Sequence, residues 1–378
     1  MMLRFIALIM LAGAVFGEVD NHVTLPLGSP APDFSLPGVD GKIHTLGEYS
    51  GSRILVIVFT SNHCPTAQLY EKRINKLAVD YRDKGVVLVA INPNDAEAVH
   101  LDELGYTDVG DGFEDMKVRA EYRHFNFSYL YDGETESVSE AYGPKATPHV
   151  FVFDEHRKLR YEGRVDNSLR ESLVKTSDAR NAIEALLAGK PVPVEHTGVF
   201  GCSIKWKSKR PGKVAEWKKI EAEPVRLEPA DTEELKKLRR NPTGKVLLVT
   251  FWATGCGPCM TEFADLETTY RMYRRRDFDL VTVATNLPDE APGVLTVLQK
   301  QHASSRNLQF ASTDTYAMQA AFDAKWDPGV PFTMVFAPDG QVVYEKQGEV
   351  DILELRRIIL ANIPDLDYIG HRAYWATK

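Results

Sequence analysis

The sequence has few cysteines, no excess of positive charge and none of the common nucleotide or hydrolase motifs. Only four of its 378 residues are cysteine, which is too sparse for a disulfide-built scaffold. The formal net charge of −8 leaves no dominant basic field to neutralise phosphates, so nucleic acid is not expected as a partner. It contains no P-loop, G-x-G-x-x-G, H-E-x-x-H or G-x-S-x-G motif. With 44% hydrophobic and 26% charged residues, the composition is that of a globular protein.

The start of the chain has the pattern of an export signal. Arg4 supplies a positive charge, residues 5–15 are apolar, and small residues precede position 18. The apolar stretch is too short to span a bilayer comfortably. An apolar first helix and an uncleaved anchor are the alternatives. We predict a signal peptide over residues 1–17 and a periplasmic or secreted protein.

Apolar runs recur in the same order in both halves of the chain. In each half the first run leads directly into a cysteine and then into a helical pattern. The order strand, helix, strand, helix, hairpin, helix implies an α/β structure with a mixed central sheet. The paired runs are residues 54–60 and 246–252, 86–92 and 280–286, 147–153 and 330–336, and 159–163 and 342–346.

This duplication predicts two domains, and the chain is long enough for both. The predicted segments are the signal 1–17, a domain over 25–190, a linker arm over 191–224, a domain over 225–362 and a tail over 363–378. The arm is rich in Pro, Lys and Glu and weak in periodicity. Its basic stretch 205–219 and the acidic segment 102–115 are both predicted to be solvated. The acidic segment lacks the ligand order of an EF-hand, and we predict no metal site.

The segment Cys256-Gly257-Pro258-Cys259 lies between an apolar run and a helical pattern. A helix N-terminus stabilises a thiolate and lowers the pKa of the first cysteine. The two-residue spacer lets the second thiol resolve a mixed disulfide within the chain, and Pro258 suits the first helical turn. Half of a zinc site or a structural disulfide would use the same spacing. Zinc needs a second ligand pair, and none lies at a plausible spacing. The pattern favours dithiol redox chemistry.

The segment from Phe251 to Cys259 resembles the thioredoxin superfamily, most closely TlpA/ResA-type thiol–disulfide oxidoreductases. That family commonly has Trp before the first cysteine, whereas Gly255 stands here and leaves the thiol more open. Trp252, within the same motif, is predicted to be a binding residue.

The resemblance assigns roles to two further residues. Pro331 matches the family's cis-proline, which lies against the cysteines and helps to dock a partner's extended chain; the alternative is the start of an edge strand. Glu262 matches an acidic position that these proteins often keep near the dithiol, or else it is an ordinary first-turn acid of a helix. Both are predicted as binding residues.

The first half resembles AhpC/TSA peroxiredoxin-like (redoxin) domains through Ala31-Pro32-Asp33-Phe34-Ser35-Leu36 and Ser61-Asn62-His63-Cys64-Pro65-Thr66. In peroxiredoxins a Thr or Ser three residues before the cysteine holds the peroxide, and Ser61 fills that place. The proline usual seven residues before the cysteine is replaced by Ile57, which weakens the peroxidase interpretation. Pro148 matches the cis-proline position again.

A second cysteine is missing beside Cys64, because Ala67 stands where a C-x-x-C motif would have it. The resemblance to proteins with a second cysteine on a C-terminal extension implies Cys202 as the partner. Three interpretations stay open: a reversible Cys64–Cys202 disulfide, a static one, and a free thiol on a domain used for binding. His63 either tunes the Cys64 thiolate or is polar surface.

The sequence therefore predicts an α/β protein of two tandem thioredoxin-like domains, each a mixed central sheet flanked by helices. The predicted function is an exported oxidoreductase that reduces protein disulfides at Cys256 and Cys259 and takes electrons from a thiol donor at the membrane. It needs no cofactor, metal or nucleic acid. The alternatives are a thiol peroxidase, with Cys64 peroxidatic and Cys202 resolving, and a non-catalytic binding or scaffold protein.

Overall fold

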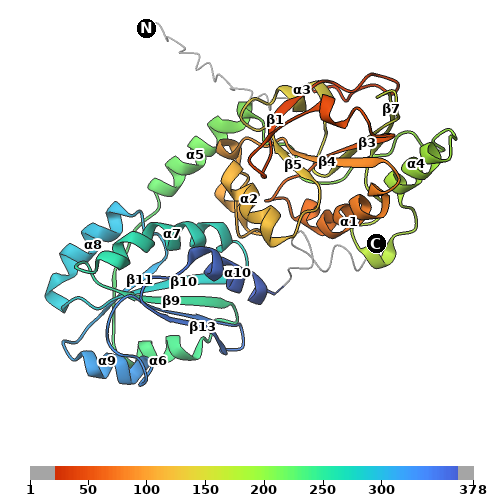
Figure 1. Cartoon of the computed structure of the whole chain (residues 1–378). Helices are drawn as coiled ribbons and strands as arrows, with labels where there is room; N and C mark the ends of the chain where they lie inside the picture. Colours follow the sequence, from red (N-terminus) through yellow and green to blue (C-terminus); the bar gives the residue numbers. More distant parts are fainter. Residues whose placement is uncertain (1–21, 365–378) are drawn as a thin grey trace, which may run out of the picture.

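The computed structural model describes residues 22–364 and contains two separate central sheets (Figure 1). The predicted signal peptide and residues 365–378 of the predicted tail lie outside the described residues. One sheet has five strands in the order β5-β4-β3-β6-β7, and the other has six in the order β13-β12-β9-β10-β11-β8. Both sheets mix parallel and antiparallel pairs, which confirms the predicted tandem thioredoxin-like α/β fold. No helix in the described part of the chain is long and apolar enough to cross a membrane.

The first domain is built around β3, whose six residues are all buried. It runs parallel to β4 and antiparallel to β6, and side chains of α1 and α4 cover one face of the sheet while α3 and the β1–β2 hairpin cover the other. The strands are β1 Ser35–Pro37, β2 Ile43–Thr45, β3 Ile54–Phe59, β4 Val86–Asn92, β5 Ser128–Tyr131, β6 His149–Phe153 and β7 Leu159–Gly163. The helices are α1 Pro65–Arg82, α2 Phe113–Tyr122, α3 Ser137–Tyr142 and α4 Asp178–Leu187.

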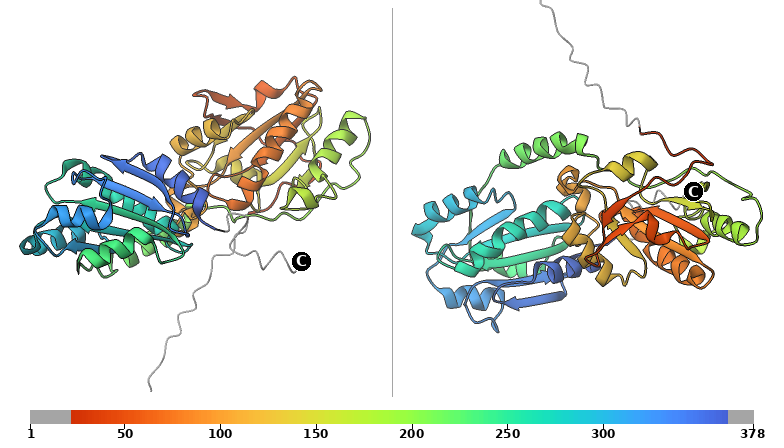
Figure 2. Two further views of the ribbon diagram at one scale, coloured as in Figure 1. Left: turned by 90° about the horizontal axis from the view of Figure 1, so that it is seen from below. Right: turned by 45° about the horizontal axis from the view of Figure 1, so that its top comes forward.

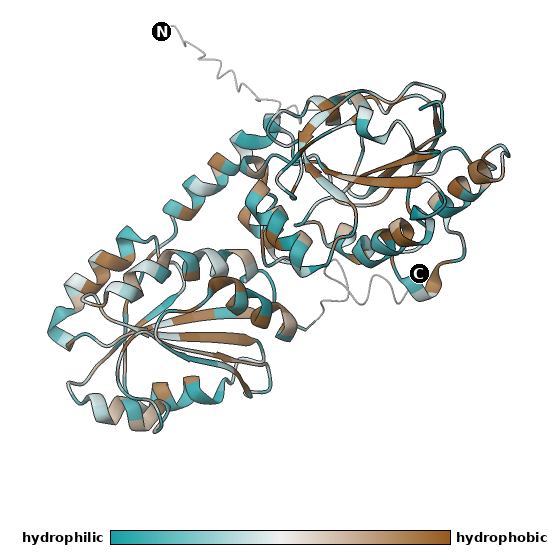
Figure 3. Ribbon diagram, viewed as in Figure 1, coloured by the Kyte–Doolittle hydropathy of each residue, from teal (hydrophilic) through white to brown (hydrophobic). Residues whose placement is uncertain are grey.

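The second domain repeats this plan around β9, which is also buried along its whole length. Helices α6 and α9 cover one face of its sheet, and α7 and α10 cover the other (Figure 1). Figure 3 shows the hydrophobic central strands of both domains. The strands are β8 Glu228–Ala230, β9 Val246–Trp252, β10 Phe278–Ala284, β11 Arg306–Phe310, β12 Phe332–Phe336 and β13 Val342–Gln347. The helices are α6 Thr232–Arg240, α7 Gly257–Tyr273, α8 Ala291–Lys300, α9 Thr315–Phe322 and α10 Ile352–Asn362.

The segment between the domains is more ordered than its composition predicts. Residues 210–221 form a further helix, α5 (Arg210–Glu221), which bridges the two domains (Figure 2). Its side chains are mostly exposed and only Ile220 is buried, so the sequence lacks the apolar stripe from which a helix is predicted.

Residues 195–206, which we call the strap, lie against the first domain before α5 begins. His196 pairs with Glu162 at the edge of the sheet, and Cys202 forms an antiparallel bridge with Thr147. The prediction of a solvated basic stretch is wrong where the strap ends, because Lys205 is buried and its ammonium pairs with Glu103.

The acidic segment 102–115 is not a solvated loop, and this prediction is also wrong. Asp108 and Asp111 are buried, at 3% and 1% exposure. Asp108 accepts hydrogen bonds from Arg119 of the first domain and from Arg357 of the second. The segment therefore forms part of the contact between the domains. Its buried carboxylates are paired with cations from distant parts of the chain.

Candidate active site

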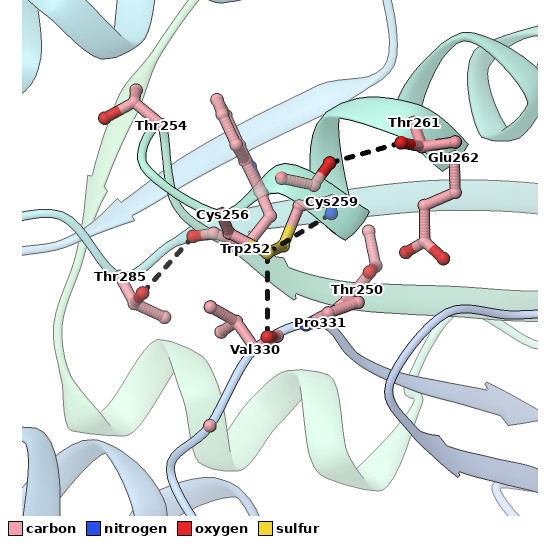
Figure 4. Close-up of a disulfide and its surroundings, with 12 residues drawn as sticks. Thr250, Trp252, Thr254, Cys256, Cys259, Thr261, Glu262, Thr285, Val330 and Pro331 are labelled. Atoms are coloured by element: carbon pink, nitrogen blue, oxygen red, sulfur yellow. Dashed lines mark hydrogen bonds between the residues drawn. A yellow bond between two sulfur atoms is a disulfide. The ribbon is translucent and has the colours of Figure 1, made fainter.

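The dithiol of the second domain lies where β9 leads into α7 (Figure 4). Cys256 is the residue before the helix, and its Sγ accepts the backbone N–H of Cys259 at 3.2 Å. The two cysteines form a disulfide with an S–S distance of 2.04 Å. Cys256 is partly exposed, whereas Cys259 is 1% exposed. This arrangement leaves the Cys256 sulfur accessible from outside and buries the Cys259 sulfur behind it.

The surroundings of Cys256 are open at the two neighbouring glycines. A Cβ atom added at Gly255 or Gly257 would meet no other atom of the described chain within 4 Å. On the opposite side, the carbonyl oxygen of Val330 lies 3.6 Å from Cys256 Sγ, and the Val330–Pro331 peptide bond is cis, as predicted. Pro331 thus lies beside the dithiol, as Figure 4 shows.

Trp252 lies in the core beneath the dithiol and not on an exposed binding surface. It is 1% exposed, and its ring packs edge-on against Phe263 at 4.9 Å between centroids. Its indole N–H is buried and has no hydrogen-bond partner among the described residues.

Glu262 lies on the same helix as the dithiol and is 3% exposed. One carboxylate oxygen accepts the backbone N–H of Val350 at 2.9 Å. Burial raises the pKa of Glu262 to about 7, against the lowering effect of that hydrogen bond, and the charge of Glu349 adds to the rise. Near neutral pH this carboxyl group can therefore take up or release a proton close to the dithiol.

The first domain repeats the geometry at Cys64 with one difference. Cys64 precedes α1, its Sγ accepts the N–H of Ala67 at 3.4 Å, and it lies 3.3 Å from the carbonyl oxygen of Thr147. The Thr147–Pro148 bond is also cis. The sulfur is 0% exposed, whereas Cys256 is partly open.

The strap is what covers Cys64. The N–H of Thr147 donates to the carbonyl of Cys202 at 3.0 Å, and a Cβ at Gly201 would lie 2.1 Å from the Thr147 oxygen. Cys64 and Cys202 are both free thiols in the structure, and Cys202 is partly exposed. The predicted partner of Cys64 is therefore adjacent to it, without a disulfide between them.

His63 is not polar surface, because it is 2% exposed and its Nδ1 lies 2.5 Å from Asp111 Oδ2. The same carboxylate accepts the backbone N–H of Asn62 at 2.7 Å and the side-chain amide of Asn94 at 2.7 Å. Burial lowers the pKa of His63, but the charge of Asp111 and its hydrogen bond outweigh this and raise it above the ordinary value. A positive charge is thereby favoured beside Cys64.

These contacts set the acidity of the two thiols of the first domain. Burial raises the pKa of Cys64, but the hydrogen bond from Cys202, the charge of His63 and the N–H of Ala67 together lower it to about 6. The pKa of Cys202 is raised, first by its hydrogen bond to Cys64 and then by burial. The proton of the pair is therefore held on Cys202.

Ser61 is buried, and its hydroxyl lies 3.0 Å from that of Thr147. The structure thus places Ser61, Cys64 and Pro148 together beneath the strap.

Asp111 is the residue of this site that the sequence did not single out. It lies in the loop between β4 and α2, 19 positions after Asn92, whose side-chain amide donates to the Asp111 carbonyl oxygen at 3.3 Å. Nothing in the neighbouring sequence distinguishes Asp111 from the other acidic residues of this loop.

Among residues 22–364, His100, Asp102 and Glu216 offer three ligand atoms within 4.8 Å of one another. All three are partly exposed. Asp102 also pairs with Arg275, so protein contacts already occupy part of this group.

The Redoxin family model matches residues 26–183 and again 221–357, so the chain belongs to the Redoxin family and carries the unit twice. The thiol-disulfide oxidoreductase ResA of Geobacillus thermodenitrificans is 26% identical over 159 residues, which cover 41% of this chain and 81% of ResA. The family match and this relative confirm the predicted resemblance to thioredoxin-like oxidoreductases.

Two solved structures are also similar to parts of the chain. The crystal structure of an uncharacterized conserved protein from Geobacillus kaustophilus is 40% identical, covers 48% of this chain and 93% of that protein, and has a TM-score of 0.43. A putative thiol:disulfide interchange protein DsbE from Chlorobium tepidum is 26% identical, with coverages of 37% and 85% and a TM-score of 0.30.

Proposed function

We propose that the protein is a thiol–disulfide oxidoreductase that reduces disulfides of partner proteins through Cys256 and Cys259. The observation that carries this proposal is the partly exposed Cys256 sulfur at a helix N-terminus, backed by a buried Cys259 and flanked by open glycines. The Cys256 thiolate attacks a partner disulfide and forms a mixed disulfide, while one partner sulfur leaves as a thiolate. Cys259 then attacks Cys256, which re-forms the internal disulfide and releases the reduced partner.

Glu262 is proposed as the group that accepts the Cys259 proton during the second attack. Cys259 is buried, so bulk water does not take this proton directly, and a carboxylate with a pKa near neutrality suits the role. Pro331 and the Val330 backbone would line the surface on which the partner's extended chain docks.

Reduction of insulin disulfides by the mature protein tests this function. Cys256→Ser should abolish the activity, and Cys259→Ser should accumulate a mixed disulfide with the substrate. Full activity in Cys256→Ser, or no activity in the unaltered protein with a thiol donor present, would contradict the proposal. The second result would favour the binding or scaffold alternative.

Export is proposed on the pattern of residues 1–17, and the electron donor on the need to re-reduce Cys256 and Cys259 in an oxidising compartment. A thiol protein at the membrane would fill that role. Cell fractionation of the full chain and of a chain lacking residues 1–17 tests the location, since both in the cytoplasm would contradict export.

A second function, thiol peroxidase, is favoured by the contact between Cys64 and Cys202. In this scheme the Cys64 thiolate attacks the outer oxygen of a hydroperoxide, the O–O bond breaks, the alcohol leaves, and Cys64 becomes a sulfenic acid. Cys202 then condenses with the sulfenic acid to form a disulfide and release water. Ser61 lies beneath the strap with Cys64, in the place that the resemblance assigns to peroxide binding. Peroxide consumption that is equal in the unaltered protein and in Cys64→Ser would rule this function out.

A further inference from the structure

The two cysteine pairs of the chain are in opposite redox states in the structure. Cys256 and Cys259 form a disulfide, whereas Cys64 and Cys202 are thiols. Exchange between the pairs therefore balances without any other oxidant: one dithiol and one disulfide become one disulfide and one dithiol. In either direction two electrons and two protons move between the pairs.

We propose that the Cys64–Cys202 pair is a substrate of the Cys256–Cys259 centre of a second copy of this chain, and that Cys256 and Cys202 are the sulfur atoms joined during exchange. This inference rests on the proposed function of Cys256 and Cys259.

Exposure selects Cys202 as the sulfur that Cys256 reaches. Cys64 is 0% exposed beneath the strap, whereas Cys202 is partly exposed and lies between the exposed Gly201 and Ser203. The strap is an extended segment that bridges to Glu162 through His196 and to Thr147 through Cys202, and an extended chain is the form that can meet the open surface around Cys256.

Leaving-group chemistry selects the same sulfur. When a disulfide is attacked at one sulfur, the other departs as a thiolate, and a more acidic thiol departs faster. Cys64 would leave at the N-terminus of α1, stabilised by the Ala67 N–H and the positive His63, and its pKa lies at about 6. Attack on Cys202 therefore expels the better leaving group.

The steps of the reductive direction follow. The Cys256 thiolate forms a bond to Cys202 Sγ as the Cys64–Cys202 bond breaks, and Cys64 takes the electron pair. Cys259, having lost its proton, then bonds to Cys256 Sγ as the Cys256–Cys202 bond breaks. Cys202 leaves as a thiolate and takes up a proton, which restores the dithiol seen in the structure.

The contact between the domains points to a second copy of the chain. The far end of α7 is held on the first domain, where Tyr273 donates to the carbonyl of Thr107 at 2.8 Å and Arg276 to that of Gly105 at 2.9 Å. Cys256 lies at the opposite end of this 17-residue helix, about 25 Å away. Within one chain Cys256 therefore lies at the end of α7 that is remote from this contact with the first domain.

Two variants test the inference: one keeps only the attacking thiol, and the other keeps only the disulfide that is attacked. The donor is Cys64→Ser/Cys202→Ser/Cys259→Ser, whose one thiol among these four positions is Cys256. The acceptor is Cys256→Ser/Cys259→Ser, oxidised with diamide to form Cys64–Cys202. After mixing, acid quenching and proteolysis, mass spectrometry should find Cys256 linked to Cys202.

A link to Cys64, no link at all, or failure of diamide to join Cys64 to Cys202 would overturn the inference. The same donor is offered insulin in parallel. Capture of insulin without capture of the acceptor removes the inference and leaves the proposed function intact, whereas capture of neither counts against both.

The number of copies is tested with the unaltered chain. A preparation with Cys64–Cys202 oxidised and Cys256/Cys259 reduced should equilibrate at a rate proportional to protein concentration. A rate that does not change over a tenfold dilution would overturn the requirement for a second copy.

Discussion

The carboxylate of Asp108 accepts a hydrogen bond from Nε of Arg357 at 2.7 Å and thereby joins the loop after β4 to α10. Its other oxygen accepts from Nη1 of Arg119 at 3.1 Å. The Asp108 side chain is 4% exposed, so water screens these pairs poorly. One buried carboxylate therefore compensates cations from both domains.

Asp108→Ala should lower the free energy of unfolding by about 3 kcal/mol, because it leaves Arg119 and Arg357 with less compensation in a buried place. Urea unfolding followed by circular dichroism measures the change. Asp102→Ala is the matched control from the same segment. Its partner Arg275 is 72% exposed, so the loss should stay below about 1 kcal/mol. An equal decrease in the free energy of unfolding in the two variants would show that the buried ion pairs of Asp108 stabilise the protein no more than an exposed pair does.

Glu262 should make stability fall with rising pH. Its pKa is about 7 in the folded protein against the ordinary 4.5, so the folded state binds more protons than the unfolded state between these values. The free energy of unfolding therefore decreases as pH rises through that window. Glu262→Gln should remove this part of the decrease, as measured by urea unfolding at several pH values. Glu233→Gln, at a 72% exposed side chain, should keep the unaltered slope.

Asp111→Asn should raise the pKa of the Cys64 thiol from about 6. Without the carboxylate, His63 loses the partner that favours its charged form, and the thiolate loses a neighbouring positive charge. With Cys256–Cys259 oxidised, thiolate ultraviolet absorbance reports only the Cys64–Cys202 pair. Glu114→Gln, 82% exposed in the same segment, should leave the titration unchanged. An unchanged titration in Asp111→Asn would show that the charge of His63 does not lower the pKa of the Cys64 thiol.

Gly201→Ala should speed the alkylation of Cys64. The added Cβ would lie 2.1 Å from the Thr147 oxygen, so the strap must move away from Cys64. Overpacking of this kind costs about 1–3 kcal/mol. This corresponds to about a tenfold larger population of molecules in which the strap has moved away from Cys64. Labelling with a thiol reagent and peptide mapping measures the rate. Gly198→Ala, whose Cβ would meet no described atom within 4 Å, should label like the unaltered protein.

The sequence was sufficient for the features that depend on local pattern. The buried strands β3 and β9, the helices that follow Cys64 and Cys256, and the two proline positions all come from short apolar runs and residues next to them. The juxtaposition of Cys256 and Cys259 follows for the same reason, because it depends on four consecutive residues.

The features that the sequence missed depend on partners far along the chain. Asp111 pairs with His63 from 48 positions away, and Asp108 pairs with Arg357 from 249 positions away. No local pattern separates a carboxylate with such a partner from a solvated one. Helix α5 was missed for a different reason, since it spans two domains and has little apolar surface to form a pattern.

The placement of Cys202 on the strap has a consequence for the unfolded chain. A Cys256–Cys259 bond closes a ring of only a few residues, whereas a Cys64–Cys202 bond would enclose most of the first domain. Cross-linking so long a loop removes chain entropy from the unfolded state worth about 5 kcal/mol, on the loop-entropy account of disulfides. Oxidation of Cys64 and Cys202 would then raise the melting temperature of the first domain. Oxidation of Cys256 and Cys259 would change the melting temperature of the second domain much less.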